Sequence, residues 1–560
     1  MIAQKHITKI VAVIMTIMVC FCLAAMVFAE AVVEAFDGSE ITMEYASRLF
    51  DTEEIIHINI VMDEEEWEEM LANATAEAYY SCDVEIDGEM FSRVGIRPKG
   101  NTSLTAIASD PDTDRYSLKL EFDQYVEGQT CFGLDKLILN NHYADATSMK
   151  EAFIYDMYQY LGADASLYNY AEISVNGEYW GLYLALEAVE DSFLLRNYGT
   201  ENGELYKPDS MNMGDRGGGG FGGFSMGGNG ANLNYTDQNL DSYSSIWEGE
   251  VTDTTDVDHK RVVKALQNIS EGTDLEKYMD VDNLLKYMAV HVFSVNEDSL
   301  SGMMAHNYYL YESDGQLNIL PWDYNLALGG MGQMGGRTGS DSATSTVNDA
   351  IDHAFSGTEF FDTLMEVEEY HAKYYGYLKQ LAEAYMDGND FEEFYHRTRN
   401  QIDSLVESDP TAFYTYEEYR EAVDTLYQVV QLRGQSISRQ IEGMIPSTEE
   451  EQRDSDTLID ASHLDLGVMG SMSMGDHMQS RKGDEGSPED FDPSRFEGKM
   501  PGGGQQPPEN GMGNMTNINF DRNDTGKRGT EALILYGICF LVLIVALVFA
   551  KLYPRRFRKR

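Results

Sequence analysis

The sequence predicts an α+β fold with a β-rich N-terminal lobe, an α-rich C-terminal lobe and a transmembrane helix near the C-terminus. Three observations lead to this prediction. Short alternating apolar runs bounded by turn residues dominate from residue 56 to about residue 206. Apolar residues at helical spacing dominate from about 255 to 446. Residues 532–550 are apolar and uncharged, over about the length that a bilayer requires.

The N-terminal lobe is predicted to consist of strands joined by tight hairpins. Asp-Gly at 87–88 and Asn-Gly at 176–177 each separate two alternating runs, and these dipeptides favour two-residue hairpin turns. Residues 116–122 alternate as a further strand, with Lys119 on the face opposite the apolar residues. A glycine-containing turn also joins two β-like runs near residue 314 in the C-terminal half.

The main helix predicted among these strands covers residues 145–161, and short helices are expected after the first strand and after the hairpin at 176–177. The apolar residues of the main helix recur at helical spacing, Asp145 or Thr147 can cap its N-terminus, and Gly162 ends it. Residues 104–114, which lie before it in the chain, are predicted as loop.

The charge of the chain limits its partners. The 560 residues include 95 Asp and Glu against 40 Lys and Arg, a net charge of −55. A nucleic-acid-binding protein needs a basic surface, so no nucleic-acid partner is expected. The acidity suits a solvated surface protein or one with cationic partners, and solubility alone explains it equally well.

Both ends of the chain are predicted to carry membrane-related segments. Lys5 and Lys9 precede an apolar run that ends at a small residue, Ala29, which is typical of a secretory signal peptide. The run is long, so an uncleaved anchor helix is the alternative. The C-terminal apolar stretch is followed by a basic tail, and basic residues stay on the cytoplasmic side. Either way, the prediction is a single-pass protein of the cell membrane whose main part is extracytoplasmic.

Composition sets the domain boundaries. Two Gly- and Met-rich stretches are predicted as insertions that form no core, and an acidic, Gly- and Pro-rich segment as a disordered stalk. The folded part contains two cysteines, Cys82 and Cys131. They form either one disulfide or two free, buried thiols. The predicted order is a signal peptide (1–29), a lead-in (30–54), a folded domain (55–446) with insertions at 211–232 and 329–340, the stalk (447–530), the transmembrane helix (531–551) and the cytoplasmic tail (552–560).

A first group of candidate site residues lies in the N-terminal lobe. A loop of small residues lets backbone amides approach phosphates, a strand lysine can hold phosphate oxygens, and a helical glutamate can keep that lysine in place. A surface turn, a solvated lysine and an exposed glutamate explain the same residues from composition alone. The members of this group are Arg97, Lys99, Asn101, Ser103, Lys119 and Glu151.

A second group, Asp298, Asn307 and Asp323, lies at the ends of the hairpin in the C-terminal half. Its oxygen atoms are the hard ligands that Mg²⁺ prefers. In a Mg²⁺-nucleotide phosphotransferase, one aspartate accepts the proton of the acceptor hydroxyl, while an asparagine and a second aspartate hold the metal. Turn capping by Asp and Asn side chains explains the same residues. His306 has no partner in the sequence and is interpreted as a structural histidine.

Several sequence blocks together resemble the CotH kinase family, named for the spore coat protein H. The resemblance runs in chain order from about residue 55 to 440, and its most specific blocks are NGEYWGLY and HNYYLY followed by PWDYN. The blocks GIRPKGNTS, YSLKLEF and LYKPD extend it. This family is similar to protein kinases, so the resemblance implies a two-lobed, atypical protein-kinase-like fold. It also implies phosphorylation of protein Ser or Thr that depends on ATP and Mg²⁺.

The resemblance further implies roles for individual residues. Lys119 resembles the phosphate-binding lysine and Glu151 its helical partner. Asp298 resembles the aspartate of the catalytic loop, and Asn307 and Asp323 resemble the metal ligands. The hinge between the lobes is expected near Leu186-Glu187, which adds Glu187 to the nucleotide-binding residues Arg97, Lys99, Asn101, Ser103 and Lys119.

The chain departs from the family pattern at two places. Asn325 stands where family members often carry a second aspartate. Asn307 follows Asp298 by nine positions, whereas protein kinases use about five. In addition, Arg97 and Lys99 compete with Lys119 for the phosphates.

The expected substrate is a protein with Ser/Thr-rich, basic segments, because an acidic enzyme attracts cationic partners. An alternative keeps the fold without the activity, as an acidic surface, adhesion or envelope-assembly protein. Turnover of the nucleotide separates these two hypotheses.

Overall fold

The structure is a computed structural model, and its described residues belong to one unit, Glu40–Asp484. Within them, no helix combines the length and the apolar character needed to cross a bilayer. The predicted signal peptide, transmembrane helix and basic tail lie outside them and stay predictions. The described residues are 43–200, 202–208, 228–302, 305–331, 342–352, 355 and 357–471.

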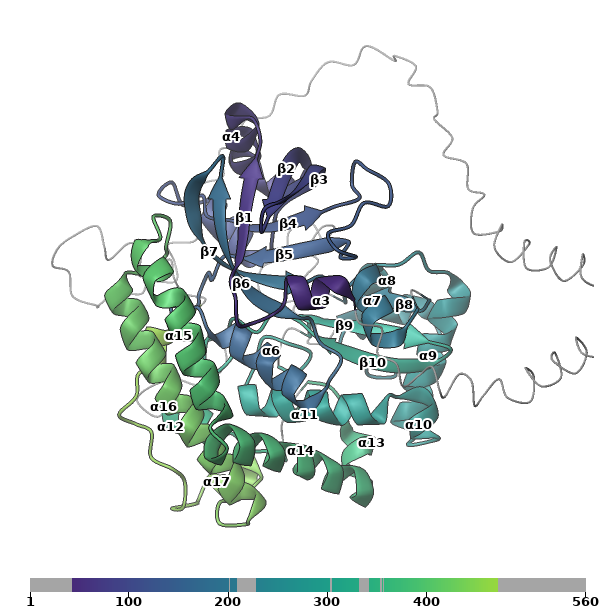
Figure 1. The fold of residues 1–560 in the computed structure, drawn as a ribbon. Coiled ribbons are helices and arrows are strands. Elements are labelled where there is room, and N and C mark those ends of the chain that lie inside the picture. Colours follow the sequence, from purple (N-terminus) through teal and green to yellow (C-terminus); the bar gives the residue numbers. More distant parts are fainter. Residues whose placement is uncertain are drawn as a thin grey trace, which may run out of the picture. The chain divides into compact units, whose positions relative to one another are not determined.

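Seven strands of the N-terminal half form a closed barrel in the order β1-β2-β3-β4-β5-β7-β6 (Figure 1). Neighbouring strands are antiparallel except β1 and β6, whose parallel pairing closes the barrel. Every second residue along a strand points into the barrel, and these residues are mostly apolar, as Leu118 and Leu120 of β4 show. The strands are β1 (Ile56–Val61), β2 (Tyr80–Ile86), β3 (Glu89–Lys99), β4 (Ser117–Glu121), β5 (Lys136–Asn140), β6 (Tyr168–Val175) and β7 (Glu178–Glu187).

A second sheet has three strands in the order β10-β9-β8. It consists of β8 (Glu204–Tyr206), β9 (Tyr308–Ser313) and β10 (Gln316–Pro321). Asn307 directly precedes β9, and Asp323 follows β10 by two residues. The hairpin β9–β10 therefore places these two residues at the same end of the sheet.

The predicted hairpin turns are confirmed. Each joins its strands through two residues with positive φ, from 49° to 91°, which the primed hairpin turns require. Asp and Asn tolerate this conformation better than other side chains, and Gly adopts it freely. The turns lie at residues 87–88, 176–177 and 314–315.

The C-terminal half is mainly helical, and helix α6 packs between it and the barrel (Figure 1). Helices α11, α14 and α16 contact one another, and α11 lies beneath α6 in Figure 1. The helices are α3 (Glu44–Arg48), α4 (Glu64–Ala72), α5 (Thr102–Ala108), α6 (Lys150–Leu161), α7 (Asp191–Tyr198), α8 (Ser244–Trp247), α9 (Asp256–Ser270), α10 (Leu275–Tyr278), α11 (Val281–Ser294), α12 (Ser342–Val347), α13 (Asp362–Met365), α14 (Glu368–Asp387), α15 (Asp390–Ser408), α16 (Tyr416–Ile441) and α17 (Glu449–Gln452). Short 3₁₀ turns are η1 (Ala74–Ala76), η2 (Gly228–Gly230), η3 (Leu240–Tyr243) and η5 (Leu466–Met469).

Two local predictions were wrong. Helix α6 begins at Lys150 rather than at residue 145, because the Asp145 carboxylate accepts hydrogen bonds from the backbone N–H groups of Thr147 and Lys150 and holds a turn there. The predicted loop after Ser103 contains helix α5, which buries Leu104 and Ile107 at helical spacing.

The folded domain continues past the predicted boundary at residue 446. Residues 447–471, called here the C-terminal extension, include α17 and η5, and they bury Leu466 and Met469. The backbone N–H of Ala146 donates to the Met469 carbonyl at 3.1 Å. The rest of the predicted stalk lies outside the described residues.

Two further features bear on the predictions. Residues 228–232 of the first predicted insertion are described and pack against the domain, with Gly230 and Ala231 buried. Cys82 and Cys131 are free, buried thiols, so the structure contains no disulfide between them.

Candidate functional site

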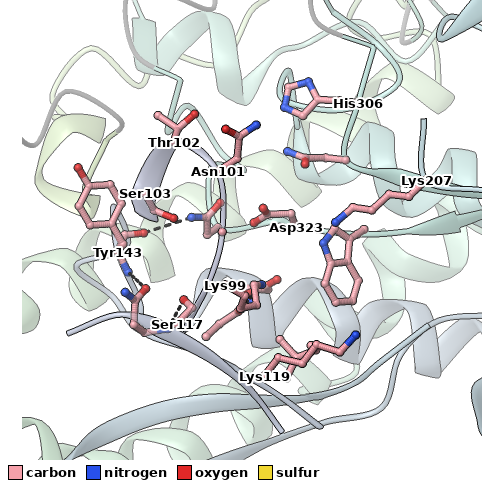
Figure 2. A pocket seen from close by; sticks show the side chains of 18 of the residues that line it. Lys99, Asn101, Thr102, Ser103, Ser117, Lys119, Tyr143, Lys207, His306 and Asp323 are labelled. Carbon is pink, nitrogen blue, oxygen red and sulfur yellow. Dashed lines mark hydrogen bonds between the residues drawn. The ribbon is translucent and has the colours of Figure 1, made fainter. Parts of the chain in front are cut away.

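A cavity of about 380 Å³ brings the two groups of candidate residues together (Figure 2). Strands β3, β4 and β5 and helix α6 contribute one part of its lining, and the segments around β9 and β10 contribute the other. The predicted residues that line it are Arg97, Lys99, Asn101, Ser103, Lys119, Glu151, Asp298, Asn307 and Asp323. Their catalytic and binding roles stay predictions.

Three basic side chains reach the cavity from the barrel. Arg97 on β3 is the direct cross-strand partner of Lys119 on β4, and Lys99 follows Arg97 by two positions. Because side chains alternate along a strand, these three residues share the face opposite the barrel core. The pleat therefore gathers three positive charges at one wall of the cavity.

Lys99 is linked to helix α6 through Asn140. The Lys99 ammonium donates to Asn140 Oδ1 at 2.9 Å, and Asn140 Nδ2 donates to Glu151 Oε2 at 2.9 Å. Burial lowers the pKa of Lys99, although the carboxylates of Asp323 and Glu151 oppose this shift. Lys99, rather than Lys119, is therefore connected to the predicted helical glutamate, through the side chain of Asn140.

The predicted pairing of Lys119 with Glu151 is not present. Lys119 instead donates to Glu190 Oε1 at 2.6 Å, and Lys136 on the adjacent strand bonds the other carboxylate oxygen. Burial alone would raise the pKa of Glu190, but the two ammonium groups hold it below its usual value. The reason is positional, because β4 and β5 carry both lysines toward the start of α7, where Glu190 stands.

Asp298 is held by two neighbours from the segment before β9. Asn307 Nδ2 donates to both the backbone carbonyl and Oδ2 of Asp298, each at 3.0 Å. His306 Nε2 lies 2.9 Å from Asp298 Oδ1. No partner for His306 is evident in the sequence, but the structure pairs it with the predicted catalytic aspartate.

Asn307 and Asp323 both have left-handed backbone conformations, with φ of 57° and 60°. Asp and Asn are the non-glycine residues that tolerate this region best, and such conformations cluster at functional sites. Burial raises the pKa of Asp323, Lys99 opposes the shift, and Asp298 adds to it.

Glu151 is a second buried acid at this site. It is 5% exposed, and within the described part of the chain its Oε1 has no hydrogen-bond partner. Burial and the nearby Asp323 carboxylate raise its pKa to about 8. Two carboxylates therefore share a poorly solvated space with the Lys99 ammonium.

Glu187 is the predicted residue that the structure does not bring to the cavity. Its carboxylate is fully buried, accepts two hydrogen bonds from Arg196 at 2.9 and 2.5 Å, and accepts a third from Tyr45 at 2.5 Å. The end of β7 is held against α7 by this ion pair. Glu187 has the contacts of a structural residue.

The sequence analysis missed several residues that line the cavity. Two examples lie in the family blocks. Trp322 directly precedes Asp323 in PWDYN, and Lys207 is the lysine of LYKPD. The Lys207 and Lys99 ammonium groups lie 5.2 and 5.4 Å from the Trp322 ring centroid. Asn325, the departure from the family pattern, also lines the cavity and donates to a backbone carbonyl at 3.2 Å. Proximity to the motif residues was the available signal.

The donor set fits Mg²⁺ better than a softer metal. Asp298, Asn307 and Asp323 offer carboxylate and carboxamide oxygens, which are hard ligands. Among the described residues, no group of three His, Cys, Asp or Glu side chains is placed to enclose a metal ion. Mg²⁺ usually takes only one or two protein carboxylates and completes its shell with waters and phosphate oxygens.

Comparisons with known proteins agree with the motifs. The family described as CotH kinase protein matches residues 96–437, more than half of the chain. Inner spore coat protein H of Bacillus subtilis (strain 168) is 24% identical over 214 residues, which cover 37% of this chain and 53% of that protein. The chain therefore spans about half the length of this curated relative. Since the family match runs from β3 to α16 and includes both walls of the cavity, the chain belongs to the CotH kinase protein family.

Proposed function

We propose that this protein transfers a phosphoryl group from ATP to Ser or Thr hydroxyls of a protein substrate, with Mg²⁺ as cofactor. One observation carries the proposal. In a chain of net charge −55, the cavity lining gathers four cations, Arg97, Lys99, Lys119 and Lys207, beside acids that include Glu151, Asp298 and Asp323. Cations gathered against acids are what a Mg²⁺-nucleotide complex requires.

The basic wall would bind the phosphates. Lys99 is the best placed of its residues, because its ammonium group donates to the neutral amide of Asn140, whereas Lys119 is paired with the Glu190 carboxylate. Arg97 forms an ion pair with Glu77, with 2.9 Å between Nη1 and Oε1. Desolvation inside the cavity strengthens each of these contacts relative to water. We therefore assign Lys99 the leading role in phosphate binding and Lys119 a supporting one.

The acidic wall would bind the metal and receive the proton. Asp323 and the carboxamide oxygen of Asn307 would hold Mg²⁺, which when bound neutralises charge on the phosphates and orients them. Asp298 would accept the proton of the acceptor hydroxyl. Asn307 and His306 fix the orientation of the Asp298 carboxylate through the bonds described above. Preorganised contacts of this kind lower the cost of aligning the base with its substrate.

The substrate and the location follow from charge and from the ends of the chain. A negative protein attracts basic segments, so we propose an acceptor with Ser or Thr among Lys and Arg residues. We also propose an extracytoplasmic site on a membrane-tethered chain. The name of the relative in Bacillus subtilis refers to an inner spore coat, and a coat or surface location is consistent with this proposal.

The test uses full-length protein purified in detergent, ATP labelled at the γ-phosphate, Mg²⁺ and a lysine-rich histone as acceptor. Label is expected on Ser or Thr of the histone, and Asp323→Ala is expected to abolish it. Asp314→Asn is the matched control, because Asp314 is an exposed residue in the turn of the same hairpin and tolerates Asn. Nucleotide binding without transfer in the wild-type protein would favour the inactive surface-protein alternative.

A further inference from the structure

A buried histidine connects the two segments that carry the predicted aspartates. His291 lies on α11 and is 2% exposed. Its Nε2 is 2.6 Å from Ser301 Oγ, and its Nδ1 is 3.4 Å from the Tyr324 hydroxyl. Ser301 lies three residues after Asp298, and Tyr324 directly follows Asp323.

The imidazole is neutral and can serve both partners at once. Burial lowers the pKa of His291 to about 4, so the ring carries one proton at neutral pH. We assign the tautomer protonated at Nε2, in which the ring donates to Ser301 and accepts from Tyr324. The Tyr158 hydroxyl on α6 lies 2.6 Å from that of Tyr324 and can donate to it. The resulting chain of hydrogen bonds runs from α6 through His291 to the Asp298 segment.

The segment from Asn296 to Ser301 forms a turn that is closed by hydrogen bonds of its own. The Asp298 N–H donates to Asn296 Oδ1 at 3.2 Å, and Ser299 Oγ donates to the Asn296 carbonyl at 3.0 Å. These bonds close the turn on itself, but they do not attach it to a helix. The bond from His291 Nε2 to Ser301 is the short side-chain contact that attaches the turn to α11.

The side chains of this network are all shielded from solvent. His291, Ser301 and Tyr324 are buried, and the His291 ring also stacks on Tyr287 with ring centroids 5.6 Å apart. A buried polar chain is retained only when its members satisfy one another, and it then fixes one geometry. Here the geometry that it fixes is the placement of Asp298 relative to Asp323.

We propose that His291 is a positioning residue for the phosphotransfer reaction, holding the Asp298 segment in register with Asp323. This inference rests on the proposed function. His291 contacts neither substrate nor nucleotide, since it lies outside the cavity lining. Its loss should therefore reduce kcat and leave nucleotide affinity nearly unchanged, because misplacement of a reacting group by about 1 Å can cost about 100-fold in rate.

The test compares full-length His291→Phe, Ser301→Ala and Tyr324→Phe with wild type. His291→Phe keeps an aromatic ring but loses both hydrogen bonds, and Ser301→Ala removes one of them with a minimal change in volume. We expect kcat for histone phosphorylation to fall at least tenfold in His291→Phe and Ser301→Ala. The Kd for Mg²⁺-ATP from calorimetry should stay within threefold of wild type. His291→Gln, which can still donate toward Ser301, should recover part of the loss.

His259→Phe is the matched control. Like His291, His259 is a largely buried histidine on a helix and does not line the cavity, but its partners Trp247 and Glu250 lie far in sequence from Asp298 and Asp323. Its substitution should leave kcat within twofold of wild type. Should His291→Phe fail to fold, Ser301→Ala carries the test.

The outcomes separate the two proposals. Wild-type protein that transfers no phosphate to the histone overturns the proposed function, and the role of His291 falls with it. Wild-type transfer together with unchanged kcat in Ser301→Ala overturns the role of His291 alone. A parallel loss of kcat and of Mg²⁺-ATP affinity, with no rescue by Gln, would show a general structural role and would also overturn it.

Discussion

The Arg115 guanidinium and the Asp409 carboxylate form an ion pair of 2.6 Å, and each side chain is only 3% exposed. Arg115 precedes β4 of the barrel, and Asp409 follows α15 of the helical half. Arg115 Nε also donates to the carbonyl of Asn141 at 3.1 Å, and Asn141 lines the cavity. The pair therefore joins the two halves of the domain directly beside the candidate site.

Removing one partner of this pair should be costly. Asp409→Ala leaves a buried guanidinium without its carboxylate, and such a change typically costs about 3–5 kcal/mol of unfolding free energy. Denaturant unfolding of the full-length protein measures it. Lys379→Ala, which removes an ion pair whose side chains are both 58% exposed, should cost less than about 0.5 kcal/mol. Equal costs for the two variants would contradict this account of the pair.

Lys119 and Lys136 offer a matched pair for phosphate binding. Both bond Glu190, but Lys119 lines the cavity, whereas Lys136 is not part of the lining. Lys119→Ala should weaken Mg²⁺-ATP binding by about tenfold, equivalent to about 1.4 kcal/mol. Lys136→Ala should change it less than about threefold. If calorimetry gave equal losses for both, Lys119 would act only through Glu190.

The buried acid Glu151 predicts a dependence of stability on pH. Its pKa is raised to about 8 in the folded protein and lies near 4.3 in an unfolded chain. The folded state thus binds this proton more tightly, and its stabilising contribution is present below pH 4 and lost as pH rises toward 8.

Glu151→Gln stays neutral and should avoid this loss. At pH 8.5 its unfolding free energy should exceed that of wild type by at least about 1 kcal/mol, and the difference should shrink toward pH 5. Glu68→Gln, the same change on the exposed face of α4, serves as the control. A Glu151→Gln variant less stable than wild type at pH 8.5 would show that the ionised carboxylate stabilises the fold.

The C-terminal extension should stabilise the segment that follows Asp323. Leu466 is buried against Gly329, where an added Cβ would lie 2.7 Å from Leu466 Cδ1 and φ is +91°. Leu466→Ala should cost about 2–5 kcal/mol through the cavity it leaves. Gly329→Ala should also destabilise, through the clash and the positive φ.

A double variant, Leu466→Ala with Gly329→Ala, separates the effect of the clash with Leu466 from the backbone strain at residue 329. The double variant should lose less unfolding free energy than the two single variants lose together. The reason is that Leu466→Ala removes the atom with which the new Cβ collides. Thermal unfolding of the full-length variants measures this coupling. Wild-type stability in Leu466→Ala would mean that the extension is not part of the folded domain.

Local chemistry explains what the sequence could predict. The hairpin turns depend on two adjacent residues whose conformational preferences are intrinsic, so Asn-Gly and Asp-Gly located them correctly. The alternation around Lys119 also determined which face it occupies, and the structure agrees. Motif resemblance located the residues that line one cavity, although their roles stay predictions.

Long-range pairing explains what the sequence could not predict. The partner of Lys119 is Glu190 rather than Glu151, and this choice depends on strand register and on the start of α7. Closure of the barrel depends on parallel pairing of β1 with β6, which lie about a hundred residues apart. Composition suggested a stalk from residue 447, but a few buried residues such as Leu466 suffice to dock a short segment.

The most direct test of the central claim is the intact mass of a lysine-rich histone after incubation with full-length protein, ATP and Mg²⁺. Wild-type protein should increase the histone mass by whole phosphoryl groups, located on Ser or Thr. The increase should be lost with Asp323→Ala, with Asp298→Asn or on chelation of Mg²⁺, and kept with Asp314→Asn. An unchanged histone mass with wild-type protein, or the same increase with Asp323→Ala, would contradict it.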